Sequence, residues 1–158
     1  MGAAVNRFIS RFNEFQSLQA GESFSIRVTD FEAEEAAKEY LAENREQVSG
    51  LIRQAAGVSL EVSDPSIRFH PDEIVLSAKG GRGLLKVRAS LSADVRWNGG
   101  LNVNVQSLEL PFVSVTPQKL NSVVEGPLKG VMERVEKYAE IRSFRITEGA
   151  AVLDAVRK

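Results

Sequence analysis

The alternating run over residues 84–97 constrains the fold more than any other part of the chain. Its apolar positions are Leu85, Val87, Ala89, Leu91, Ala93, Val95 and Trp97, and they alternate with Lys86, Arg88, Ser90, Ser92, Asp94 and Arg96. Alternation of this length predicts a long antiparallel strand with one apolar face and one polar face. At about 3.3 Å per residue the strand spans roughly 45 Å, whereas a usual strand spans ~17–20 Å. Such a strand needs long partners to cover its apolar face.

Two long amphipathic helices are predicted to provide that cover. The first begins with a capping box formed by Thr29 and Glu32 and ends at a glycine cap, Gly57. The second begins at Thr116-Pro117 and is expected to kink at Gly126-Pro127. Both helices are apolar over a broad face and carry small residues, so the space beneath the sheet is filled either by neighbouring side chains or by a ligand.

The remaining pattern predicts further antiparallel strands. A turn at Asp64-Pro65, a turn at residues 70–73, a glycine-rich loop at residues 80–83 and a hairpin at Asn98-Gly99-Gly100 separate them. A change of phase near Gln106-Ser107 predicts a β-bulge. Short strands are also expected at residues 24–28, 144–146 and 150–156. The predicted fold class is α+β, with one long, strongly curved antiparallel sheet wrapped around one or two long amphipathic helices.

Composition limits the functional classes open to the chain. Its 158 residues fit one folded domain, which we place at residues 21–158 after an N-terminal helix within residues 1–20. The net charge of -1 and the lack of a basic block argue against binding to nucleic acid. The chain has no cysteine, which excludes thiolate catalysis and thiolate metal sites. No stretch reaches the ~20 apolar residues of a membrane span, and we expect a soluble protein.

The N-terminal segment is predicted to form an amphipathic helix. Val5, Phe8, Ile9, Phe12, Phe15 and Leu18 recur at spacings of three and four. Three interpretations stay open: a terminal helix packed on the domain, a segment that contacts a membrane peripherally through Phe8, Phe12 and Phe15, or the stub below an anchor.

No residue pattern predicts catalysis or a metal site. His70 is the only histidine, with Asp72 and Glu73 nearby. A metal site would need further soft ligands and a general base would need a nucleophile partner, and neither is visible. The glycine-rich segment at residues 80–83 precedes a strand, so it is not a phosphate-binding loop. The carboxylates between Asp30 and Glu46 are interpreted as a solvated helix face. We therefore expect no enzyme activity, no catalytic residue, no metal and no cofactor.

Basic residues gather around the polar face of the long strand and the strand before it. They are Lys79, Arg82, Lys86, Arg88 and Arg96. They are candidate contacts for an anionic lipid headgroup, since each basic charge near a membrane surface contributes roughly 1 kcal/mol. The alternative is an ordinary polar sheet face.

Several segments together resemble a known family. They are residues 24–29 leading into a helix, residues 64–76, the long strand with its Asn98-Gly99-Gly100 hairpin, residues 115–121 at a helix start, and residues 141–149. In order and turn chemistry they resemble bacterial LmeA-like phospholipid-binding domains of the tubular lipid-binding (TULIP) superfamily. The resemblance implies a curved half-barrel, an apolar groove, a lipid ligand, no catalytic group, and a location at or outside the bacterial cell membrane.

The function predicted from the sequence is non-enzymatic binding of a lipid or another hydrophobic ligand between sheet and helices. The predicted groove residues are Leu41, Val48, Leu51, Ile52, Leu85, Val87, Leu91, Val95, Trp97, Leu120, Val124, Leu128, Val131 and Val135. The alternative is a structural or interaction domain with a fully packed core, held near a membrane by the N-terminal segment. The identity of the ligand and the oligomeric state stay open.

Overall fold

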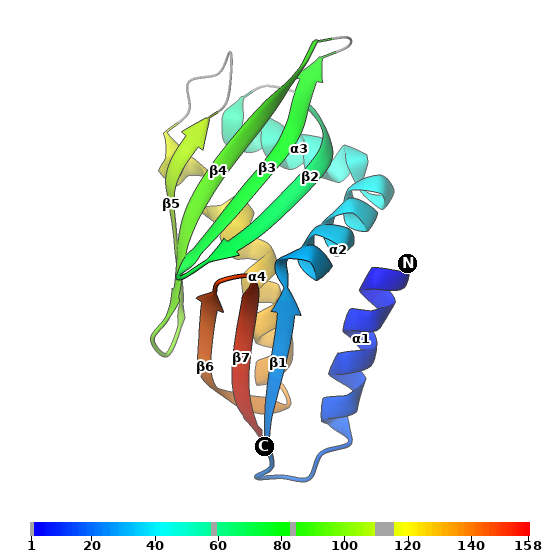
Figure 1. Cartoon of the computed structure of the whole chain (residues 1–158), viewed down its shortest axis with the longest axis vertical. Coiled ribbons are helices and arrows are strands. Elements are labelled where there is room, and N and C mark those ends of the chain that lie inside the picture. Colours follow the sequence, from blue (N-terminus) through cyan, green and yellow to red (C-terminus); the bar gives the residue numbers. More distant parts are fainter. Residues whose placement is uncertain (1, 58–59, 83–84, 110–115) are drawn as a thin grey trace.

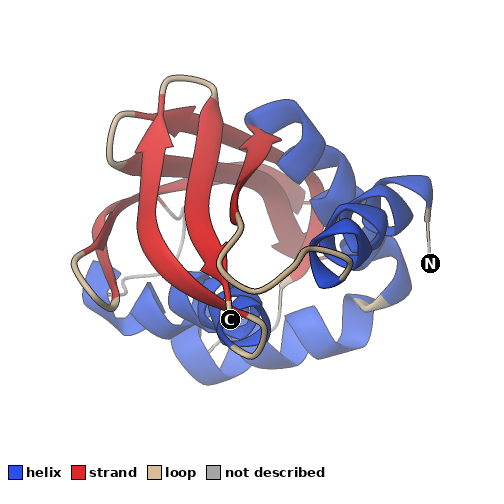
Figure 2. Ribbon diagram, turned by 90° about the horizontal axis from the view of Figure 1, so that it is seen from below, coloured by secondary structure: helices blue, strands red, loops and turns tan. Residues whose placement is uncertain are grey.

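The chain folds into two antiparallel sheets with helices on one side of them (Figure 1). The computed structural model describes residues 2–57, 60–82, 85–109 and 116–158. The strands are β1 (Ser23–Thr29), β2 (Glu61–His70), β3 (Glu73–Arg82), β4 (Leu85–Trp97), β5 (Leu101–Glu109), β6 (Ala139–Thr147) and β7 (Ala150–Arg157). The helices are α1 (Ala3–Gln16), α2 (Asp30–Glu43), α3 (Arg45–Ala56), the 3₁₀-helix η1 (Pro117–Leu120) and α4 (Asn121–Glu136). Seen from below, helices border the strands along the bottom and the right of the view (Figure 2).

The α+β class is as predicted, but the single long, strongly curved sheet is wrong. One sheet has three strands in the order β1-β7-β6, and the other has four in the order β2-β3-β4-β5. Alternation shows that a strand has one apolar face, but it does not say which strands pair. The strands of the C-terminal hairpin pair with β1, from the start of the chain, instead of extending the sheet around β4. The half-barrel implied by the family resemblance is therefore not the observed architecture.

The helices follow the predicted boundaries with two differences. The capping box of Thr29 and Glu32 is present, and Gly57 closes α3 in the left-handed region at φ 72°. The helix expected over residues 29–57 is divided at Asn44, whose N–H donates to the carbonyl of Tyr40 and ends α2. The second helix opens with the 3₁₀ turn η1, after which α4 continues through Pro127.

The predicted bulge in β5 is confirmed, whereas two predicted loops are wrong. Ser92 pairs with Ser107 and Ala93 pairs with Val105, which leaves Gln106 as the extra residue of β5. The expected turn at Asp64-Pro65 is a bulge within the continuous strand β2. The glycine-rich segment is not a loop over residues 80–82, because β3 continues through them.

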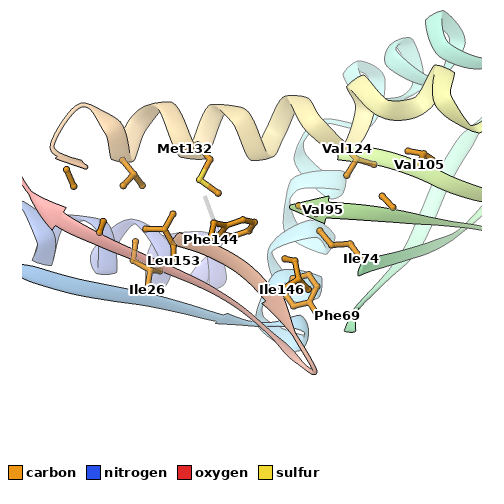
Figure 3. Close-up of a cluster of buried hydrophobic side chains, with 14 residues drawn as sticks. Ile26, Phe69, Ile74, Val95, Val105, Val124, Met132, Phe144, Ile146 and Leu153 are labelled. Carbon is orange, nitrogen blue, oxygen red and sulfur yellow. The ribbon is translucent and has the colours of Figure 1, made fainter. Parts of the chain in front are cut away.

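A hydrophobic core runs through both sheets and is bridged by α4 (Figure 3). Its buried members on the three-stranded side include Ile26, Phe144, Leu153, Met132 and Val135, and those on the four-stranded side include Phe69, Ile74, Ala93, Val95, Val105 and Val124. Ile146, at the end of β6, lies where the two groups meet (Figure 3). One helix thus packs on both sheets.

Side chains from the helices satisfy backbone groups along the edges of three strands. On β2, the Ile67 N–H donates to Glu34 at 3.2 Å and the Phe69 N–H donates to Asp30 at 3.4 Å. On β5, the Val105 N–H donates to Asn121 Oδ1 at 2.7 Å. On β1, Arg11 from α1 donates to the Arg27 carbonyl at 3.1 Å. Partnered edges are protected against pairing with another chain.

Candidate functional site

The apolar face of the four-stranded sheet is the candidate site, since it carries most of the strand residues predicted to line a groove. Across β3 and β4 this face is built from directly opposed pairs. They are Ile74 with Ala93, Leu76 with Leu91, Ala78 with Ala89, and Gly80 with Val87. α3 and α4 lie behind the sheet in Figure 1. The pairs therefore form successive rungs from the centre of the molecule toward its upper end.

Burial falls along these rungs. At the central end Ala93, Val95 and Val105 are 0% exposed, and Ile74 is 5% exposed. Toward the upper end, Leu76, Ala78, Val87, Ala89 and Leu91 are only half-buried. The same apolar face is therefore fully packed at one end and incompletely covered at the other.

Gly80 marks open space at the upper end. Its backbone is buried, yet a Cβ built on it would meet no described atom within 4 Å apart from its chain neighbours. Because side chains alternate along a strand, that Cβ would lie on the same face as Ala78. Among the described residues, the face therefore leaves room for at least one additional apolar group beside Gly80.

The helices bring further apolar side chains to this end of the molecule. Leu41 of α2 and Val48 and Ile52 of α3 are half-buried, while Leu51 is 51% exposed. α3 is linked to the start of β2 by a hydrogen bond from the Ser49 hydroxyl to the Leu60 carbonyl, at 3.3 Å. α3 therefore adds partly exposed apolar surface close to the incompletely covered end of the sheet.

The other predicted groove residues do not all lie at this half-covered end of the sheet. Val95, Val124 and Val135 are buried in the core, and Trp97, Leu120 and Leu128 pack against it, while the half-buried Leu91 of the rungs also packs against the core. Val131 is 39% exposed on α4, and the side chain of Leu85 lies outside the described part of the structure. The structure thus divides the predicted groove into a filled central part and a half-covered upper part.

The candidate headgroup residues are on the opposite, polar face of β4 or near it. Lys79 pairs with Asp64 at 3.3 Å. Arg96 pairs with Asp94 at 2.9 Å, and Arg88 donates to the Ser77 hydroxyl at 3.1 Å. Lys86 is exposed, and the side chain of Arg82 is not among those described. The sheet itself therefore separates Lys86 and Arg88 from the apolar face, and their headgroup role stays a prediction.

A polar row on the three-stranded sheet was not anticipated. Asp154 stands directly opposite Ser25 on one neighbouring strand and Ser143 on the other, and it accepts hydrogen bonds from both hydroxyls. These bonds, Ser25 first, lower the pKa of Asp154, and Arg145 at 3.9 Å adds to the effect. A shallow recess of about 310 Å³ adjoins the row. Ser25 is 129 positions from Asp154 in the sequence, so only the strand register shows that they meet.

His70 is the last residue of β2, paired with Glu73 of β3, and its ring Nδ1 lies 3.1 Å from Glu148 in the turn between β6 and β7. Within the described residues no group of three or more His, Asp or Glu side chains is arranged to hold a metal ion.

α1 is attached through charged groups. Arg7 pairs with Glu35 at 2.8 Å, and Arg11 pairs with Glu32 at 2.5 Å. The side chains of Phe8, Phe12 and Phe15 lie outside the described part of the structure. In the described part of the chain, no helix combines the length and the apolar character that crossing a bilayer requires.

Comparison of the chain with known families, curated proteins and solved structures gives no match. The resemblance to LmeA-like domains therefore stays a prediction from the sequence.

Proposed function

We propose that this chain is a non-enzymatic binding domain that takes the apolar part of a lipid or another amphiphile against the upper end of the four-stranded sheet. The observation that carries the proposal is the open space beside Gly80, on an apolar face that is 0% exposed at Ala93 and Val95. The domain packs one end of this face completely and leaves the other end half-covered. Apolar surface without a partner is characteristic of binding sites.

The size of the ligand follows from the energetics of burial. Each buried methylene contributes about 0.8 kcal/mol, whereas association costs ~4–15 kcal/mol in lost freedom. A chain of about six methylenes gains only ~5 kcal/mol, and one of about fourteen gains ~11 kcal/mol. We therefore expect binding of long acyl or alkyl chains and none of short ones.

Substitution of Gly80 tests the proposal. Titration with a dansylated sixteen-carbon fatty acid, followed by fluorescence, measures affinity, and a dansylated six-carbon acid is the short-chain control. Gly80→Val places two methyl groups in the open space and should weaken binding at least tenfold. Ser90→Val, which places the same side chain on the polar face of β4, should leave affinity unchanged. Equal affinity in both variants, or no binding of the long probe by the unmodified chain, would refute the proposal.

A second candidate function is an interaction domain held at a membrane by α1. It is favoured by the position of this helix, which lies at the side of the molecule and is joined to α2 by the ion pairs of Arg7 and Arg11 (Figure 1). The test is flotation with phosphatidylglycerol vesicles. Replacement of Phe8, Phe12 and Phe15 by serine should abolish flotation, whereas Gly80→Val should not affect it. Flotation of the serine variant at the unmodified level would exclude this function.

A further inference from the structure

α1 lies along a row of acidic side chains on α2. The row consists of three glutamates that share one face of the helix at spacings of three and four residues: Glu32, Glu35 and Glu39. Glu35 pairs with Arg7 at 2.8 Å, and Glu32 pairs with Arg11 at 2.5 Å. The Glu39 carboxylate lies against the backbone of the residue before α1. Among the described residues, α2 is the main neighbour of α1, and its acidic row faces the two arginines.

The contacts of α2 with α1 are separate from those that hold α2 in the fold. Oε1 of Glu32 accepts the Thr29 N–H at 3.3 Å in the capping box, whereas Oε2 pairs with Arg11. On its other side, α2 is joined to β2 by Asp30 and Glu34, which accept N–H groups from that strand. α1 can therefore leave while α2 keeps its first turn and its contact with the sheet.

The charge of α2 opposes contact between docked α1 and an anionic surface. α2 has six acidic residues and one lysine, whereas α1 has two arginines and one glutamate. While Arg7 and Arg11 face the acidic row, their charge is balanced and the neighbouring carboxylates repel other anions. The side chains of Arg7 and Glu35 are 59% and 58% exposed. Ion pairs as exposed as this one contribute little to stability, so the arginines can change partners.

We propose that α1 is a detachable helix whose Arg7 and Arg11 exchange the carboxylates of α2 for the phosphates of an anionic lipid surface. The proposal rests on the second candidate function, in which α1 holds the domain at a membrane, and it adds that α1 first leaves α2. Arginine binds carboxylates and phosphates through the same forked N–H donors, so the exchange replaces bonds of one kind with bonds of the same kind. Docked α1 keeps the domain off the membrane, and released α1 binds it.

Neutralising the acidic row tests the exchange. Glu32→Gln combined with Glu35→Gln removes both carboxylate partners, and glutamine at position 32 still suits a capping box. The variant should need at least threefold less phosphatidylglycerol than the unmodified protein for half-maximal flotation. Glu133→Gln with Glu136→Gln is the matched control, because it removes two exposed charges at the same spacing on α4. It should change the lipid requirement by less than a factor of two.

Spin labels report directly whether α1 has left α2. Because the chain has no cysteine, Ser10→Cys on α1 and Ala42→Cys on α2 place one label on each helix at exposed positions. Phosphatidylglycerol vesicles should shift the distance between the labels to longer values, and phosphatidylcholine vesicles should leave it unchanged. With Glu32→Gln and Glu35→Gln added, the longer distances should be present before any lipid.

The possible results separate the exchange from membrane binding itself. Flotation of the unmodified protein with an unchanged label distance would refute release of α1 and leave the second candidate function standing. Equal lipid requirements for the α2 variant and its α4 control would show that the acidic row does not hold α1 back, which also refutes the exchange. If neither the unmodified protein nor the α2 variant floats, the exchange and the second candidate function fail together.

Discussion

Two identical substitutions on one strand test whether packing really declines along the apolar face of β4. Val95 and Val87 lie on the same face, but Val95 is 0% exposed while Val87 is half-buried opposite Gly80. Valine to alanine removes two methyl groups, worth about 1.6 kcal/mol of transfer free energy. At a closed site the cavity left behind adds ~1 kcal/mol. We therefore expect Val95→Ala to lower the free energy of unfolding by about 2.5 kcal/mol, and Val87→Ala by less than about 1 kcal/mol.

Urea denaturation followed through Trp97, the only tryptophan, measures both losses. The slope of unfolding free energy against urea should be the same for both variants, so that the midpoints report stability alone. In a thermal scan, Val95→Ala should lower the unfolding midpoint by about 5–10 °C. Losses that agree within about 0.5 kcal/mol would refute the packing gradient, since that is the spread of surface substitutions. The proposed binding face would lose its main support with it.

Three further predictions concern polar groups. The pKa of Asp154 is held below its ordinary value of 3.8, chiefly by the Ser25 hydroxyl. Its stabilising effect is therefore present above pH 3.8 and is lost as pH falls through the lowered pKa. Ser25→Ala should raise that pKa toward 3.8 in a carboxyl NMR titration, and an unchanged titration would contradict the assignment. Thr29→Ala should cost about 1 kcal/mol in urea denaturation because it removes a helix cap, and an unaltered midpoint would show that the cap contributes nothing. Arg11→Ala should speed amide exchange in α1 more than Arg7→Ala, whose ion pair is the more exposed; equal effects would count against this ranking.

Features set by neighbouring residues were predicted well from the sequence. The bounds of β4, the capping box at Thr29 and the bulge at Gln106 follow from local spacing and turn chemistry. The error at Asp64-Pro65 has a local cause too. The pair is typical of a turn, but Asp64 at φ 49° forms a bulge that leaves β2 paired with β3 on both sides. Turn residues do not distinguish a reversal of the chain from a bulge within a strand.

Features that depend on pairing distant strands were not predictable. The sequence places Val95 and Val87 on one apolar face, but it contains nothing that makes one of them filled and the other half-covered. The filled end is the one where Val95 joins the buried cluster that includes Val124 of α4 and Ile146 of the three-stranded sheet. Gly80 illustrates the same limit. Its position suggests a loop from the sequence, and only the register with Val87 shows that it leaves open space on a sheet.

The carboxylates of α2 show that one sequence pattern of acidic residues is compatible with two structural roles. Asp30 and Glu34 belong to a run interpreted as a solvated helix face, yet Asp30 is 7% exposed and the Glu34 side chain is 14% exposed. Both accept backbone N–H groups from the edge of β2. Burial raises the pKa of Glu34, but the Ile67 N–H, the Ser66 hydroxyl and Arg68 outweigh it, and the net shift is downward. Because acidic residues near a helix start are also favoured by its dipole, their sequence pattern is the same whether a strand edge lies beside them or not. Only the position of β2 distinguishes the two roles.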